Sequence, residues 1–571
     1  MMRLIPCLAL LFGQGHAALS LRLVDGMTRV PRSGAMAEQT PDLRAARGEW
    51  EPVQVVLSGA AAELKGVTVE VTALTAGEKS VIAEPEVLRA HYVRVSKPTP
   101  MSPMPPSEHA DALVPQDFPW QELPQDTENV NQPFWVDLHV PYTAQPGAHS
   151  GGIRVRKDGA EVLTHPLSLA VLDFDMPTVP RLRSSIMTVW RRIAEAHGFD
   201  RQQEPPAPEL AALLEEYHDL LARHRLSIDT IHPTFPDHRT GRLDETAVEM
   251  ALRKHLLHRH ASTISLPIWS QWPFADPLGA DREAAQLYAA TWMKVVKKLR
   301  CEARGYVIHS DLDEPNSADD YAMVRRWGDF FNEAEHKHGV RLPLLITEQP
   351  TPDDPWWGRL DGSVDIWVPH ISSVWQDMEA PDGKRDIERR VKAGDEVWCY
   401  AALVQMPDAW ERAHCKPEVL RESNPPVWCL DFPAMNHRIP AWVMPLHGIT
   451  GFCYWDTLHA EPGVDVWADA GNFLHPEAGS YNGDGSYIYP ATRERHGRHM
   501  PVASVRLKWL REMTEDYDYL MLARDLGLCN EAQLLADTFA RGFGDWEDRM
   551  DKLFEARRKL ADLIVRKGGR S

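Results

Sequence analysis

The stretch Tyr306-Val-Ile-His-Ser-Asp-Leu-Asp-Glu-Pro-Asn316 decides how the chain folds. Its first residues are apolar and typical of a strand, and it then runs into three carboxylates before Pro315, which fixes φ and lacks a backbone donor. Acidic side chains at the end of a buried strand are a common mount for a catalytic acid. We therefore predict a strand over Tyr306–Asp311 with an acidic site at its carboxyl end.

Two adjacent carboxylates, Asp313 and Glu314, are the candidate catalytic pair. Side chains alternate faces along a regular strand, so both can enter one pocket only where the strand bends, and Pro315 is placed to bend it. An ordinary helix entry is the alternative, with Asp313 or Asn316 capping a helix that starts near Ser317.

Runs of β-rich sequence alternate with helical stretches from Arg181 onward, a pattern that favours parallel strands joined by helices. Pro208–Arg223, for example, carries one apolar stripe at helical spacing. Eight strands predict a (β/α)8 TIM-type barrel over residues 179–525. Val427–Leu430 is an alternative strand that would change the count by one. The eight are Ser185–Trp190, Ile228–His232, Thr263–Trp269, Tyr306–Asp311, Leu344–Thr347, Val364–Pro369, Val397–Ala402 and Thr450–Trp455.

The chain before this region alternates apolar and polar residues over short runs separated by Gly, Pro and Asp, as in Pro52–Leu57 and Phe134–Val140. This pattern predicts an antiparallel β-sandwich over residues 19–178. The Pro-rich segment Lys97–Pro124 is expected to be irregular and to reach toward the next domain. Residues 526–571 are expected to form a helical extension whose final helix, Trp546–Lys567, presents a solvated basic face.

Composition excludes some partners. The formal net charge of −20 disfavours nucleic acid and anionic membrane surfaces, which both attract basic patches. The 20 Trp residues suit stacking on sugar rings. We find no phosphate-binding loop, dinucleotide fingerprint, metal-ligand spacing or G-x-S-x-G elbow, so no cofactor or metal is expected. A glycan or glycoconjugate is the expected partner.

Residues 1–18 read as a secretory signal, with Arg3, the apolar run Leu4–Phe12 and small residues near Ala17. The run is too short to span a bilayer, so we expect export to the periplasm or the extracellular space without membrane insertion. Six cysteines follow at wide, irregular spacings that imply no disulfide framework.

Barrel enzymes place their sites at the carboxyl ends of the strands. The aromatic and ionisable residues at those predicted ends are the candidate substrate-binding residues, although a structural role is about as plausible for each one alone. They are Trp190, His232, Trp269, Glu348, His370, Tyr400, Trp455 and Asp456.

The expected second carboxylate of an ordinary retaining glycosidase is missing from the seventh strand, which has only Glu396 at its start. Two adjacent carboxylates on the fourth strand instead suit substrate-assisted catalysis, in which the 2-acetamido group of the substrate attacks the anomeric carbon. Asp313 would hold that group and Glu314 would protonate the leaving oxygen. A glycosidase with Glu348 or Asp456 as a separate nucleophile, or a non-catalytic carbohydrate-binding protein, are the alternatives.

Several segments, in this order, resemble glycoside hydrolase family 123 and its uncharacterised relatives. They are Ala45–Leu57, Asp111–Pro115, Pro133–Pro141 with Gly147–Gly152, Asp313–Pro315, Arg438–Trp455, Asp484–Pro490 and Ser504–Tyr519. The resemblance covers nearly all of the chain after the signal. It implies an N-terminal β-sandwich, a (β/α)8 barrel, and β-N-acetylgalactosaminidase activity with an Asp-Glu pair that corresponds to Asp313 and Glu314.

Overall fold

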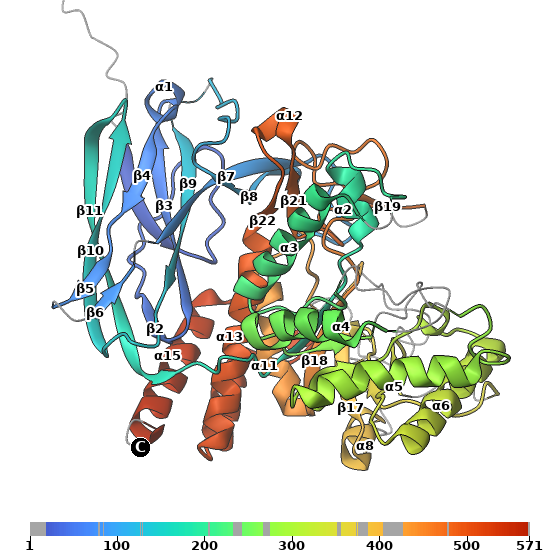
Figure 1. Cartoon of the computed structure of the whole chain (residues 1–571). Coiled ribbons are helices and arrows are strands. Elements are labelled where there is room, and N and C mark those ends of the chain that lie inside the picture. The colour runs from blue at the N-terminus through green and yellow to red at the C-terminus, as the bar shows by residue number, and fades with distance from the viewer. Residues whose placement is uncertain are drawn as a thin grey trace, which may run out of the picture.

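The computed structural model describes residues 19–568 apart from residues 78–79, 84, 126, 128, 204–205, 232–242, 267–273, 351–355, 373, 375–385, 404–425 and 477–478. Figure 1 shows a mixed α/β protein with two regions side by side, an N-terminal layer of antiparallel sheets and a second region of short parallel strands and helices.

The N-terminal region contains two sheets that pack face to face. Apolar residues of both, such as Val55 from one sheet and Ile153 from the other, share a single buried cluster. One sheet has the order β1 (Ser20–Asp25), β3 (Trp50–Gly59), β9 (Val130–His139), β7 (Glu86–Val95) and β8 (Ser107–Pro115). The other has the order β2 (Arg44–Arg47), β11 (Ala160–Asp175), β10 (Gly147–Lys157), β5 (Leu74–Ala76) and β6 (Ser80–Ile82), with β4 (Thr68–Val71) also on β10. Within them only β2 and β11 run parallel.

One expectation for this region was partly wrong. The middle of the Pro-rich segment Lys97–Pro124 forms strand β8, which pairs with β7 and buries most of its later residues. The segment does reach the second region: the amide of Thr99 donates to Asp431 Oδ2 at 2.7 Å, and Ala112 forms a bridge with Ser504.

The second region begins with parallel strands. Five form one sheet in the order β12 (Arg183–Ile186), β18 (Ile449–Tyr454), β17 (Glu396–Tyr400), β16 (Ile366–Trp367) and β15 (Leu345–Ile346). Two more, β13 (Ile264–Ser265) and β14 (Gly305–Tyr306), form a parallel pair. Each of these strands lies within or beside a segment predicted from the sequence, but most are shorter than predicted.

Single backbone contacts join these sheets. Ile186 forms a parallel bridge with Ile228, and the Ser265 amide donates to the Asp229 carbonyl at 2.7 Å. Val307 in turn forms a parallel bridge with Leu344. Backbone contacts therefore run from each predicted strand to the next along the chain, and from β18 back to β12.

Helices cover these strands on the outside (Figure 1). Helix α3 spans Pro208–Arg223, as predicted, and buries the stripe that includes Leu210, Leu214 and Leu221. Further helices in the described part of this region are α2 (Trp190–Ala196), α4 (Glu245–Leu252), α5 (Arg282–Lys298), α6 (Ala318–His338), α8 (Asp386–Ala393), α11 (Ile439–Val443) and α12 (Arg493–His496). The short α1 (Ala61–Leu64) lies in the sandwich.

Helix α13 (Val505–Asp525) is buried along nearly its whole length, because it lies between the sandwich and the second region (Figure 1). Its polar side chains bond to both: Lys508 donates to Asp137 of β9 at 2.6 Å, and Tyr517 donates to the Ile449 carbonyl at 3.1 Å. The helix therefore joins the two regions as well as covering the parallel strands.

The C-terminal extension differs from expectation in two details. The extension was expected to be helical, but only α14 (Cys529–Ala536) precedes the hairpin of β23 (Ala540–Gly542) and β24 (Asp545–Trp546). Helix α15 (Met550–Gly568) has a mainly exposed basic face, but Arg557 is 11% exposed and pairs with Glu49 and Asp516, so this cation is not solvated. Two further hairpins join β19 (Phe473–His475) to β20 (Gly479–Tyr481) and β21 (Ile488–Ala491) to β22 (Met500–Ala503).

Two observations concern the membrane and the thiols. Within the described residues, no helix is both long enough and apolar enough to cross a bilayer. The described cysteines are free thiols, and Cys301, Cys399 and Cys429 are buried.

Candidate active site

The predicted strand Tyr306–Asp311 ends earlier than expected. Only Gly305 and Tyr306 form β14, and Ser310–Leu312 makes a 3₁₀ turn. The cause is local, because the ring nitrogen Nδ1 of His309 accepts the backbone N–H of Asp311 at 3.2 Å and so turns the chain. Asp313 and Glu314 consequently lie on a bend beyond the strand end.

The bend is sharpest at Glu314, whose φ of +46° lies in the left-handed region that residues with a side chain rarely occupy. Asn316 holds this conformation by donating from Nδ2 to the Glu314 carbonyl at 2.5 Å. Ser317 then caps α6 by accepting the N–H of Asp320 at 3.1 Å. The helix cap that competed with the catalytic interpretation is therefore Ser317, which leaves the two carboxylates free of that role.

Thr347, directly after β15, bonds to both members of the pair. Its hydroxyl donates to Asp313 Oδ1 at 2.7 Å and accepts the backbone N–H of Glu314 at 2.8 Å. Tyr400, the last residue of β17, donates its hydroxyl to Glu314 Oε1. Residues from three predicted strand ends thus meet at the two carboxylates.

The electrostatics of the pair are those of uncompensated carboxylates. The side chain of Asp313 is open to solvent, but desolvation by surrounding protein still raises its pKa. The hydrogen bond from Thr347 lowers this pKa, and the negative charge of Glu314 raises it further. Burial together with the charge of Glu314 raises the pKa of Tyr400 well above its ordinary value, so this hydroxyl stays protonated as a donor. Within the described residues, no Lys or Arg forms an ion pair with Asp313 or Glu314.

His370 supports Tyr400 from the neighbouring strand end. The two rings meet edge to face with centroids 5.0 Å apart, and His370 Nε2 lies 2.9 Å from the Ala402 carbonyl. Burial lowers the pKa of His370 to about 4, which keeps the imidazole neutral. Glu348 lies close enough for its charge to raise the pKa of Tyr400.

Other predicted site residues are placed differently. Trp190 is 2% exposed and packs in the main core, so its ring offers no face to a sugar, contrary to the prediction. Asp456 is fully buried, pairs with Arg192 and accepts the Thr457 N–H at 2.7 Å, which ties it to the local turn. Trp455 is half-buried against His459, with ring centroids 4.9 Å apart. His232 and Trp269 lie outside the described residues.

Sequence reasoning missed Asp229, which follows Ile228 in the predicted second strand. Its Oδ1 accepts the Thr188 N–H at 3.2 Å, and burial raises its pKa to about 6 despite such bonds. The charges of Asp229 and Asp313 both act on the thiol of Cys453, whose pKa burial raises. A carboxylate between two isoleucines of a predicted strand was the signal that could have identified Asp229.

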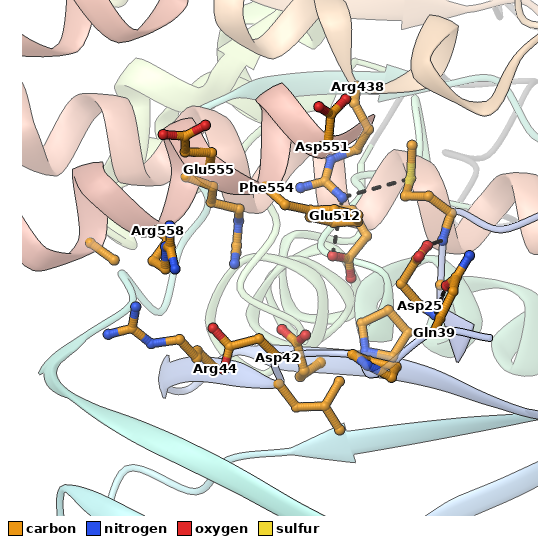
Figure 2. A pocket seen from close by; sticks show the side chains of 18 of the residues that line it. Asp25, Gln39, Asp42, Arg44, Arg438, Glu512, Asp551, Phe554, Glu555 and Arg558 are labelled. Atoms are coloured by element: carbon orange, nitrogen blue, oxygen red, sulfur yellow. Dashed lines mark hydrogen bonds and ion pairs between the residues drawn. The ribbon is translucent and has the colours of Figure 1, made fainter. Parts of the chain in front are cut away.

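A separate cavity of about 560 Å³ lies between the sandwich and α15, and none of the predicted site residues lines it. Figure 2 shows Asp42 and Arg44 of the sandwich side facing Phe554 and Arg558 of α15 across this space. In the described part of the chain, no group of three His, Cys, Asp or Glu side chains is placed to hold a metal ion.

The chain resembles known proteins in sequence over its N-terminal part and in structure over nearly its whole length. Residues 28–157 match the family model of the glycoside hydrolase 123 N-terminal domain. A family 123 glycoside hydrolase from Clostridium perfringens, whose structure was studied for glycolipid glycan hydrolysis, has a TM-score of 0.64 at 13% identity. That comparison covers 96% of this chain and 98% of the other.

Two more distant structures are a putative beta-galactosidase from Bacteroides fragilis (TM-score 0.27, 10% identity, 79% of this chain and 57% of that one) and a GH5 xyloglucanase from Bacteroides ovatus (TM-score 0.24, 10% identity, 76% and 94%). Their TM-scores are too low to support an argument. No curated protein matches the chain in sequence.

These findings confirm the resemblance to glycoside hydrolase family 123 that the sequence indicated. By sequence, residues 28–157 match a glycoside hydrolase 123 N-terminal domain. The fold of the whole chain is similar to that of the family 123 enzyme from Clostridium perfringens.

Proposed function

We propose that the protein is an exported glycoside hydrolase that releases terminal 2-acetamido sugars of the β-N-acetylgalactosaminide type by substrate-assisted retaining catalysis. The observation that carries the proposal is the pair Asp313 and Glu314, which lies at a strand end among neutral hydrogen-bond donors. The match to the glycoside hydrolase 123 domain supports the reaction class, and the glycolipid glycan hydrolysis studied in the Clostridium enzyme supports a glycoconjugate substrate.

In this mechanism the substrate supplies its own nucleophile. The acetamido carbonyl oxygen attacks the anomeric carbon, the bond to the leaving oxygen breaks, and Glu314 gives its proton to that oxygen. Asp313 accepts a hydrogen bond from the acetamido N–H and offsets the positive charge of the oxazolinium-like intermediate. Glu314 then deprotonates a water molecule, which attacks the anomeric carbon from the face that the leaving group left and breaks the bond to the acetamido oxygen. The configuration at the anomeric carbon is therefore retained.

The environment of each carboxyl suits its role. Tyr400 and the Glu314 backbone conformation fix the position of the acid. Asp313 is not neutralised by a cation within the described residues, so its negative charge remains available to the intermediate. A charge that is fixed in place before the reaction stabilises a developing cation without a cost of reorganisation.

One alternative nucleophile is disfavoured by its contacts. Asp456 is fully buried and paired with Arg192, which leaves it no open path to an anomeric carbon. Glu396 lies at the start of β17, the opposite end from Tyr400, and is bound by Arg183 at 2.8 Å. Among the described carboxylates considered, Glu348 alone keeps the separate-nucleophile alternative open.

We further propose that residues 179–525 form a closed (β/α)8 barrel, residues 19–178 the β-sandwich domain and residues 526–571 a C-terminal extension. The chain of parallel contacts from β12 through Ile228 to β18 and back supports closure. Export rests on the signal-like sequence of residues 1–18, and N-terminal sequencing of the secreted protein would test it.

A panel of aryl glycosides with and without the 2-acetamido group tests the proposed function. We expect turnover of the N-acetyl-β-galactosaminide and inhibition by a thiazoline analogue of the intermediate. Cleavage of a plain galactoside or glucoside would instead favour a separate nucleophile, and glycan binding without turnover over days would favour a binding protein.

A further inference from the structure

We propose that Thr347 is a positioning residue for the carboxylate pair: its single hydroxyl fixes which oxygen of Asp313 meets the substrate and holds the backbone of Glu314. The proposal rests on the proposed function, because it assigns Thr347 a part in preparing those two groups. Neither the sequence pattern nor the family resemblance singled out this residue.

The direction of the hydrogen bonds follows from the number of protons. Thr347 Oγ1 lies 2.8 Å from the backbone nitrogen of Glu314, which can only donate, and 2.7 Å from Asp313 Oδ1. A hydroxyl has one proton and two lone pairs. Oγ1 therefore accepts from Glu314 and gives its one proton to Asp313.

This arrangement makes the two oxygens of Asp313 unequal. Oδ1 is engaged by Thr347, whereas Oδ2 has no hydrogen bond within the described residues. The free oxygen is the one that would accept the acetamido N–H of the substrate. Thr347 thereby sets the rotation of the carboxylate before substrate binds, which is the pre-organisation that a rate acceleration requires.

The second bond acts on Glu314. A residue with a side chain at a φ of +46° persists only if its surroundings hold it there. The N–H bond to Thr347 and the Asn316 bond to the carbonyl hold this peptide on both sides. If the Thr347 bond were lost, Glu314 would relax and its carboxyl would move away from Tyr400.

Threonine suits this task better than serine on steric grounds. Its β-branch restricts χ1, so the hydroxyl keeps one direction. Valine has the same shape without the hydroxyl, and serine has the hydroxyl without the branch. Thr347→Val and Thr347→Ser therefore form a matched pair that separates the hydrogen bonds from the packing.

Kinetics on aryl N-acetyl-β-galactosaminides provide the first readout. We expect Thr347→Val to lower kcat by roughly 100-fold with little change in KM, because a misplaced catalytic group costs about that much. Thr347→Ser should stay within about threefold of the wild type. The loss in Thr347→Val should grow as the leaving group becomes more basic, because the displaced acid is needed most there.

The pH profile provides a readout that a purely structural role would not change. Loss of the hydroxyl removes a bond that favours ionised Asp313, so the pKa of Asp313 should rise further. The acid limb of kcat/KM should then move to higher pH in Thr347→Val and stay in place in Thr347→Ser.

Wild-type kcat and an unchanged acid limb in Thr347→Val would overturn the proposal, as would an equal loss in both variants. A carbon-13 titration of the Asp313 carboxyl in wild type and Thr347→Val separates this outcome from failure of the proposed function. If the wild type cleaves no aryl glycoside, the function fails, whereas a raised Asp313 pKa in Thr347→Val would still support the positioning role and an unchanged one would refute it.

Discussion

Carboxylates occur in two contrasting settings in this molecule. Next to α13, buried carboxylates meet cations: Asp516 of this helix accepts from Arg438 Nη2 at 2.6 Å, and Asp137 of β9 accepts from Arg511 at 3.0 Å and from Lys508 at 2.6 Å. At the bend after β14, the side-chain carboxylates of Asp313 and Glu314 accept only from hydroxyl groups among the described residues.

The pKa values of Asp137 and Asp313 shift in opposite directions. Burial by itself would raise the pKa of Asp137, but the charges of Arg511 and Lys508 outweigh it and hold that pKa below its usual range. Desolvation by surrounding protein raises the pKa of Asp313, and no cation among the described residues reverses this shift. Asp137, which ties β9 to α13, is thus held ionised by two cations, whereas Asp313 has a perturbed pKa without a cation partner, which is more typical of a functional group.

The largest expected effect is on catalysis. Glu314→Gln removes the transferable proton but keeps the size of the side chain, so we expect kcat on an N-acetyl-β-galactosaminide with a basic alkyl leaving group to fall by up to about 10⁴-fold, roughly 5 kcal/mol. The melting temperature should stay within a degree or so of the wild-type value, as calorimetry would show. Full activity in this variant would show that Glu314 has no catalytic role and would contradict the contrast between this carboxylate and those that pair with cations near α13.

The next effect is on stability. Asp137→Asn removes the charged partner of Lys508 and leaves Arg511 with only Glu512; Lys508 and Arg511 are 3% and 1% exposed. We expect a loss of about 3 kcal/mol in the free energy of unfolding, with kcat nearly unchanged. Denaturant midpoints would measure it. The matched control is Glu209→Gln, whose partner Arg493 is exposed, and it should cost no more than about 0.5 kcal/mol. Equal losses in the two variants would contradict the account.

A smaller, pH-dependent effect is expected at Asp229. Because burial raises its folded pKa to about 6, above the unfolded value, the folded state is favoured below pH 4 and loses this advantage as pH rises toward 6 and beyond. Asp229→Asn should therefore be more stable than the wild type by about 1–3 kcal/mol above pH 7, with no difference near pH 4. Thermal unfolding across pH 4–8 checks this, and a difference independent of pH would refute it.

Local signals in the sequence predicted local structure well. The stripe of Pro208–Arg223 specifies α3 because its apolar residues recur at helical spacing, and the alternation in Phe134–Val140 specifies β9. The strand over Tyr306–Asp311 was predicted too long, because the bond between the His309 ring and the Asp311 amide competes with strand pairing. The strand propensities of the individual residues do not account for such a hydrogen bond between a side chain and the backbone.

Long-range contacts were the part that the sequence could not provide. Thr347 is 34 residues from Asp313, and no periodicity links them, so its place at the site becomes visible only once β14 and β15 lie next to each other. Trp190 and Asp456 were named for their positions at predicted strand ends, yet packing in the core and the pair with Arg192 turn both away. Strand-end position narrows the candidates, and only tertiary packing selects among them.

The most direct test of substrate assistance compares aryl β-galactosaminides whose N-acyl group is acetyl, fluoroacetyl, difluoroacetyl or trifluoroacetyl. Each fluorine weakens the carbonyl oxygen as a nucleophile, so kcat/KM should fall steeply along the series if that oxygen attacks the anomeric carbon between Asp313 and Glu314. Values of kcat/KM that do not change along the series would contradict the account and require a nucleophile from the protein.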